Sequence, residues 1–335
     1  MPRKLNPMLS RRQFAGVTAI GVGLIARSSF AANTRLRFGH MWPASSVWGK
    51  GAQRFADLLN QKTNGHYTVR VYPDGQLGAE RDMEEGLGVG NLDCTFGGSD
   101  VLTQFEPKMG IFTMPFLFPD YAHANAVMDG PIGEEVFNAL RTRAGIRVIG
   151  SGAQGFRDVL TKKPINSMAD MKDVKIRVPE SDVMLKLFRA LGANPVSVPW
   201  TQTYMSAKSG VIDGLEGVPE VLLDFKMYEV GKYVAKTGHI LATLQLLVSD
   251  KVYQGLPPDV QKAMDDAGHQ AWDEARTAAQ AGNETALTKM GSLGEHFTTP
   301  DLTPFKEAVR PFLTDWAKAN GATALLDRIQ QAAKT

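Results

Sequence analysis

The sequence predicts an α/β fold in two halves, followed by long C-terminal helices. Near the start of the chain, strand-like alternation gives way to helix-like spacing and then to alternation again, which is how a parallel α/β unit begins. The same pattern resumes after a change of segment around residues 150–155. From Pro257 onward the chain reads as long amphipathic helices, with no strand large enough for a third sheet. These helices are therefore expected to wrap around the two halves.

In the first half, residues 34–40 place Leu36 and Phe38 on one side and two arginines on the other, which is the period-2 pattern of a strand. A proline-aspartate-glycine turn at 73–75 closes the second strand, because proline presets φ and glycine accepts positive φ. The expected elements of this half are a helix over 49–61, a strand over 67–72, a helix over 83–87, and strands over 92–96 and 146–151.

The second half carries two helix-start signals. Ser167 and Asp170 have the spacing of a capping box on a short helix. Ser181 is placed to cap a helix over 182–191 that Gly192 ends. The other expected elements are strands over 174–178, 196–198 and 211–213, a helix over 201–208, and C-terminal helices over 259–286, 304–319 and 323–333.

The first 31 residues are predicted to be a cleaved export signal and not part of the fold. Basic residues precede an apolar stretch over 14–25, and Ser29-Phe30-Ala31 supplies a small-x-small cleavage pattern. Residues 10–14 form a twin-arginine pattern, which makes the Tat route possible. The apolar stretch is too short and too rich in glycine for a transmembrane anchor, and no other segment is apolar for long enough to insert into a membrane.

Composition and charge exclude several classes of function. The chain has 335 residues, 43% of them hydrophobic, which is long enough for two sizeable cores. Five of its 37 basic residues lie in the export signal, so the mature chain has 32 basic against 35 acidic residues and lacks a nucleic-acid footprint. Cys94, the single cysteine, lies in a short apolar run and is predicted to be a buried, inert thiol.

Arg177 lies in a strand that is otherwise apolar. Its guanidinium does not lose its proton, so burial of Arg177 requires an anionic partner or contact with solvent at the end of the strand. Three partners remain open from position alone: solvent, an internal carboxylate or a ligand. Arg157 follows Gly155-Phe156, where ligands bind at strand ends in open α/β sheets. Two such arginines are able to bind one carboxylate between them.

A series of short motifs carries a family resemblance. The motifs are Phe38-Gly39-His40, Tyr72-Pro73-Asp74-Gly75-Gln76-Leu77-Gly78, Met114-Pro115-Phe116-Leu117-Phe118, Gly155-Phe156-Arg157, Lys163-Pro164-Ile165, Lys175-Ile176-Arg177-Val178-Pro179, Gly192-Ala193-Asn194-Pro195, Gly210-Val211-Ile212-Asp213-Gly214 and Thr237-Gly238-His239. Their order and spacing resemble the periplasmic solute-binding proteins of tripartite ATP-independent (TRAP) transporters, over essentially the whole mature chain.

The resemblance implies a two-lobed periplasmic binding protein, of the Venus flytrap kind, with a ligand cleft between its lobes. Lobe I is expected over 32–152 and lobe II over 153–250, with strands crossing between them and helices over 251–335 packing across both. Such a protein works in the periplasm, closes on an organic acid and delivers it to a membrane-embedded permease.

The resemblance also implies roles for individual residues. Arg177 is expected to bind the ligand carboxylate directly, Arg157 to add a second contact, and Trp200 to wall the pocket. Gly217 stands where many members of the family have an asparagine that completes the carboxylate clamp. A glycine there leaves more room for a bulkier or differently tilted ligand. The expected ligand-binding set also includes Gln154, Asp213, Glu216 and His239, although an isolated histidine such as His239 is more often a packing residue.

Lobe I is expected to supply groups that bind hydroxyls. They are His40, Trp42, Glu80, Ser99 and Asp100, which lie at strand ends or at a helix start. Glu80 also has a simpler explanation as an early-helix acid, and Asp100 as a capping residue. Two acids and a flat indole suit a polyhydroxylated ligand. We therefore expect a sugar acid such as a hexuronate or an aldonate, with a four-carbon dicarboxylate or another small carboxylate as the alternative.

Motifs for enzyme chemistry are absent from the sequence. It has no H-E-x-x-H, C-x-x-C, G-x-S-x-G or Walker A pattern, so no metal and no cofactor are expected. The glycine-rich segment 86–90 lacks the dinucleotide spacing and follows a helix. The remaining enzyme hypothesis is a lyase or hydrolase that acts on a sugar acid with Glu80 or Asp100 as acid/base.

Overall fold

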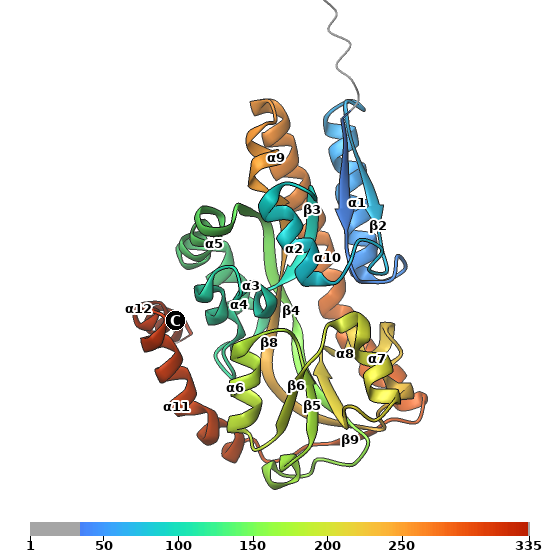
Figure 1. The fold of residues 1–335 in the computed structure, drawn as a ribbon, viewed down its shortest axis with the longest axis vertical. Coiled ribbons are helices and arrows are strands. Elements are labelled where there is room, and N and C mark those ends of the chain that lie inside the picture. The colour runs from blue at the N-terminus through green and yellow to red at the C-terminus, as the bar shows by residue number, and fades with distance from the viewer. Residues whose placement is uncertain (1–33, 334–335) are drawn as a thin grey trace, which may run out of the picture. The chain divides into compact units, whose positions relative to one another are not determined.

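The computed structural model describes residues 34–333, so the predicted export signal lies outside the described residues (Figure 1). One sheet runs through this part of the chain in the order β2-β1-β3-β8-β4-β7-β5-β6, with β9 paired to β8. Its strands are β1 (Thr34–Gly39), β2 (Tyr67–Tyr72), β3 (Cys94–Gly98), β4 (Ile146–Thr161), β5 (Lys175–Val178), β6 (Asn194–Ser197), β7 (Gly214–Gly217), β8 (Tyr233–Ser249) and β9 (His296–Thr298).

Helices connect the strands and follow them. They are α1 (Val47–Lys62), α2 (Glu80–Val89), α3 (Ser99–Leu102), α4 (Tyr121–Asp129), α5 (Pro131–Ala144), α6 (Asp182–Ala190), α7 (Trp200–Lys208), α8 (Pro219–Asp224), α9 (Asp250–Gln254), α10 (Pro258–Ser292), α11 (Thr303–Ala319) and α12 (Thr323–Ala332). Three 3₁₀ segments are η1 (Pro107–Thr113), η2 (Met168–Met171) and η3 (Met227–Glu229). Among the described residues no helix is both long and apolar enough to traverse a lipid bilayer.

The long antiparallel strands β4 and β8 join the two halves of the sheet (Figure 1). One end of β8 pairs with β3, and the opposite end of β4 pairs with β7. Three register shifts interrupt the β4–β8 pairing, and such bulges bend a strand and redirect its side chains. The last shift lies between Arg157 and Val159, next to the cavity described below.

Most of the predicted elements are confirmed to within a few residues, but the strand expected over 211–213 is wrong. That stretch is a loop with Val211 about half exposed, and the strand β7 follows it. Gly214-Leu215-Glu216-Gly217 escaped detection because it has neither alternation nor β-branched residues, although all four residues are buried. The strand expected over 146–151 continues to Thr161. Its second part was not predicted, because glycines and polar residues after Ile149 interrupt the apolar pattern.

The C-terminal helices pack on both halves. Trp272 of α10 contacts Trp48 of α1, with ring centroids 5.2 Å apart, while Met290 near its other end packs in a cluster with Leu215 of β7. Phe305 of α11 packs against α6, and Ile329 of α12 belongs to the core that covers α4 and α5. The C-terminal helices therefore contact both halves of the sheet.

Candidate functional site

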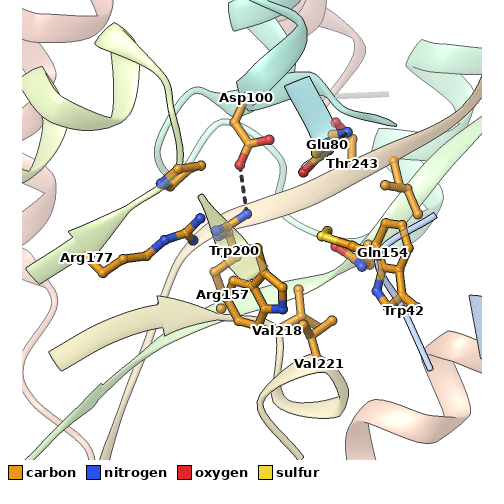
Figure 2. Close-up of a pocket in the computed structure, with 15 residues that line it drawn as sticks. Trp42, Glu80, Asp100, Gln154, Arg157, Arg177, Trp200, Val218, Val221 and Thr243 are labelled. Carbon is orange, nitrogen blue, oxygen red and sulfur yellow. Dashed lines mark hydrogen bonds and ion pairs between the residues drawn. The ribbon is translucent and has the colours of Figure 1, made fainter. Parts of the chain in front are cut away.

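A cavity of about 50 Å³ lies where the two halves of the sheet meet (Figure 2). Of the thirteen residues expected at a site, eight line it: Trp42, Glu80, Asp100, Gln154, Arg157, Arg177, Trp200 and Gly217. They come from both halves, so neither half alone would form this cavity. The remaining lining residues are Met41, Gly98, Pro179, Val218, Val221, Thr243 and Leu244.

Arg157, on β4, is held by carboxylates on two sides. It donates through Nε and Nη2 to Glu216 on the adjacent strand β7, and through Nη1 to Asp100 at 3.1 Å. Burial by itself lowers the pKa of Arg157, but Glu216 and Asp100 raise it above its ordinary value. Burial alone would raise the pKa of Glu216, yet Arg157 and His239 bring it down to about 2. This group is therefore a fixed, buried ion-pair network.

Arg177, on β5, differs from Arg157 in having no acidic partner. Its Nε donates to the carbonyl of Val198 at 2.8 Å, and its guanidinium lies 5.1 Å from the ring centroid of Trp200. Within residues 34–333 it makes no ion pair, although it is only 3% exposed. Burial lowers the pKa of Arg177 to about 10, with a further contribution from Arg157 that Glu216 opposes. A buried guanidinium in this state favours an incoming anion.

Trp200 and Gly217 form one wall of the cavity. Trp200 is the first residue of α7, and its ring packs edge-on against Phe225 with centroids 5.2 Å apart. A Cβ atom at Gly217 would lie 3.2 Å from Leu222 Cδ2 and 3.8 Å from Trp200 Cη2. The glycine therefore leaves space beside the indole.

Glu80 and Asp100 form the acidic wall opposite (Figure 2). Glu80 accepts from the backbone N–H of Gly98 at 2.6 Å, while Asp82 makes the capping bond at the start of α2. Burial and the nearby Asp100 raise the pKa of Glu80 to about 7, against the effect of the Gly98 hydrogen bond. Asp100 accepts both from Arg157 and from the Val101 N–H at 3.0 Å. Asp100 does not cap α3, whose N-cap is Gly98 without a side-chain bond, so the capping explanation is wrong and Asp100 belongs to the cavity wall.

Five of the expected site residues do not line the cavity. Ser99 lies behind it and accepts from the hydroxyl of Thr243, which does line it, at 2.7 Å. His40 is buried among aromatic rings, and this burial lowers its pKa to about 4. Asp213 accepts from the backbone N–H of Lys175 at 3.1 Å and lies in a different surface groove. These three positions give no contact with the cavity.

Glu216 and His239 lie one step behind the cavity wall. Glu216 binds Arg157, and Nε2 of His239 lies 3.4 Å from Glu216. Nδ1 of His239 is 2.8 Å from the hydroxyl of Thr237. Both residues therefore orient Arg157. Thr243 and Val221 also line the cavity but were not predicted, because Thr243 lies on β8 and Val221 on α8, two elements without a clear signal in the sequence.

The fold and this cavity define a two-lobed binding protein with a buried arginine, Arg177, in the cavity between its lobes. Residues 38–319 match the family described as bacterial extracellular solute-binding protein, family 7. The chain belongs to this family, and it is a periplasmic solute-binding protein of the TRAP type. Family members are transport proteins, so its role is binding and not catalysis.

Relatives and a solved structure agree with this assignment. The chain is 30% identical over 291 residues to the 2,3-diketo-L-gulonate-binding periplasmic protein of Escherichia coli, covering 86% of this chain and 88% of that one. It is 28% identical to the C4-dicarboxylate-binding periplasmic protein of Rhodobacter capsulatus, covering 95% and 97%. A crystal structure of a TRAP periplasmic solute-binding protein from Xanthobacter autotrophicus with bound β-D-galacturonate aligns with TM-score 0.83, 32% identity, and 88% and 99% coverage.

Proposed function

We propose that this protein captures a sugar acid, of the hexuronate or aldonate type, and delivers it to the membrane-embedded permease of a TRAP transporter. The observation that carries the proposal is the contrast between the two arginines. Arg157 is already neutralised by Glu216 and Asp100, whereas Arg177 presents a buried positive charge without an acidic partner among residues 34–333. The carboxylate of the ligand is the missing anion.

The acidic wall favours a sugar acid over a dicarboxylate. Asp100 and Glu80 lie across the cavity from Arg177, and carboxylate oxygens accept hydrogen bonds from hydroxyl groups. A second carboxylate on the ligand would meet Asp100 at short range and be repelled. The indole of Trp200 supplies a flat surface on which a sugar ring stacks. The bound galacturonate of the Xanthobacter protein supports the same choice.

A four-carbon dicarboxylate is the second candidate, since the Rhodobacter relative is named for that ligand. The two candidates differ in what must lie opposite Arg177: hydroxyl groups for a sugar acid and a second anion for a dicarboxylate. The described cavity of about 50 Å³ is small beside the roughly 300–1,000 Å³ of typical ligand pockets. Entry of either ligand therefore requires the lobes, which we place at 32–152 and 153–250, to open and close about β4 and β8.

The experiment that tests the proposal is a thermal-shift screen of residues 32–335 against hexuronates, aldonates, dicarboxylates, keto acids and aromatic acids. A ligand that binds only the folded state raises the melting temperature. We expect the largest shifts from a hexuronate or aldonate, and none with Arg177→Ala. Arg189→Ala, at an exposed position on α6, is the matched control and should keep the shift. Shifts from dicarboxylates alone would contradict the sugar-acid proposal, and no shift from any organic acid would contradict the binding role.

A further inference from the structure

The described structure contains a group of three carboxyl side chains, of which Asp100 pairs with Arg157 and the two glutamates make no ion pair with a described residue. Glu80 and Glu84 are one turn apart on α2, and Asp100 follows on α3. A Cβ atom at Gly98 would collide with Asp100 Oδ1 and would lie 3.3 Å from Glu80 Oε1, so these two oxygens are near neighbours. Glu84 is completely buried, and neither of its oxygens has a hydrogen-bond partner among the described residues.

Charged side chains from several helices and strands surround Glu80. Asp100 faces it from α3, Arg157 from β4 and Arg177 from β5. Glu84 adjoins it on α2, and Glu84 in turn lies near Glu85 and near Glu180 in the turn before α6. Neither arginine lies within ion-pair distance of Glu80, which accepts only the Gly98 N–H. Burial and the surrounding carboxylates raise the pKa of Glu84 well above its ordinary value.

Ligand binding changes this balance. Arg157 is matched by Glu216 and Asp100, so Arg177 is the cation available to the carboxylate of the ligand. Once that carboxylate is in place, an ionised Glu80 would be a further anion beside Asp100 in a closed, partly desolvated cavity. Two carboxylates that share a site retain a proton between them. A protonated Glu80 also has an O–H group to donate to a ligand oxygen, while its other oxygen still accepts from Gly98.

We infer that this protein binds its organic acid together with a proton, which Glu80 takes up as the carboxylate docks on Arg177. The inference rests on the proposed function and adds a pH-dependent step to the same site. Release of the ligand returns the proton, so affinity falls as the pH rises. The pKa of Glu80, raised to about 7 before binding, places the effect near neutral pH.

Calorimetry with D-glucuronate, or with the strongest carboxylate from the screen, tests the inference. Binding at pH 7 in phosphate and in Tris gives the number of protons from the dependence of the observed enthalpy on the ionisation enthalpy of the buffer. We expect uptake of about half a proton at pH 7, because Glu80 is about half protonated there before binding. Between pH 6 and pH 8.5 the affinity should fall about 30-fold, since the bound state holds one more proton.

Two variants identify the side chain that takes up the proton. Glu80→Gln imitates the protonated carboxyl, so it should bind at pH 7 with no proton uptake and with an affinity that is flat from pH 6 to pH 8.5. Glu85→Gln is the matched control: Glu85 is exposed on the same helix, pairs with Arg81 at 2.9 Å, and should leave the wild-type profile unchanged. Circular dichroism establishes that each variant is folded.

The outcomes separate this inference from the proposed function. If the wild-type protein binds an organic acid without proton uptake and with flat affinity, the proton inference is wrong and the binding role stands. If Glu80→Gln retains the uptake, the proton goes to another carboxyl and the assignment to Glu80 is wrong. If the wild-type protein binds no organic acid at any pH, the proposed function fails and the inference fails with it.

Discussion

Arg157 and Glu216 face each other on the adjacent strands β4 and β7 and are joined by two hydrogen bonds, one from Nη2 at 2.5 Å. Glu216 is fully buried, and Nε2 of His239 lies 3.4 Å from Oε2, the oxygen that also accepts from Nε of Arg157. This ion pair holds the guanidinium of Arg157 at the cavity and neutralises its charge. For this reason the two arginines of the site have different tasks.

The Arg177→Lys substitution should weaken ligand binding by about 2–3 kcal/mol, which is roughly 30- to 150-fold. A lysine provides a point charge, whereas Arg177 donates to the Val198 carbonyl through Nε and leaves the outer face of its planar fork for the carboxylate. Titration calorimetry measures the loss, with Arg189→Lys as an exposed control on α6. Binding equal to the wild type would show that Arg177 is not the clamp.

Removing Arg157 should destabilise the fold as well as the site. Arg157→Met leaves Glu216 buried without its cation, and breaking such a pair costs about 3–5 kcal/mol in the free energy of unfolding. Arg54→Met is the control, because Arg54 and Glu274 form an exposed pair and their loss should change stability little. Urea unfolding monitored by circular dichroism provides both values. An equal effect of the two substitutions on the free energy of unfolding would mean that the buried pair between β4 and β7 does not stabilise the fold.

Gly217→Asn should change ligand preference more than stability. The added Cβ requires Leu222 to shift by a few tenths of an ångström, and the side chain fills the space beside Trp200. We expect affinity for hexuronates to fall relative to affinity for four-carbon aldonates, as measured by calorimetry with both ligands. Gly217→Ala adds only the Cβ and should have an intermediate effect. An unchanged ratio of affinities would show that this space is not used by the ligand.

A cross-link between the lobes should report closure. The hydroxyl of Thr103, after α3, lies 3.4 Å from that of Ser181, before α6. Cysteines at both positions would be near disulfide geometry in the closed form. Ligand should therefore speed disulfide formation in Thr103→Cys/Ser181→Cys, as seen by gel shift, with each single variant as control. Cys94 is buried, which raises its pKa well above the ordinary value, and does not compete. Equal rates with and without ligand would contradict closure at this contact.

The stability of the protein should fall as the pH rises from 5 to 8, in part because of Glu220. Burial and the nearby Asp224 raise its pKa to about 8, against about 4.3 in the unfolded chain. The folded state therefore holds the extra proton, and the stabilisation, complete below about pH 4, is lost as the pH rises through 8. Glu220→Gln should be more stable than the wild type at pH 8 by roughly 2–4 kcal/mol but equal at pH 4. Urea unfolding at both pH values, with the exposed Glu284→Gln as control, measures the difference.

The sequence by itself determined the α/β class, the helical C-terminus and both arginines, because alternation, helical spacing and motif order are local properties of the chain. Tertiary structure decided which arginine is free. That choice depends on the register in which Val159 of β4 lies opposite Glu216, and no local pattern encodes a pairing between residues so far apart. It also decided that His40 and Asp213 lie away from the cavity and that Thr243 lines it. Thr243 reaches the cavity because its strand, β8, pairs with β3 and with β4, and these contacts form only when the sheet assembles.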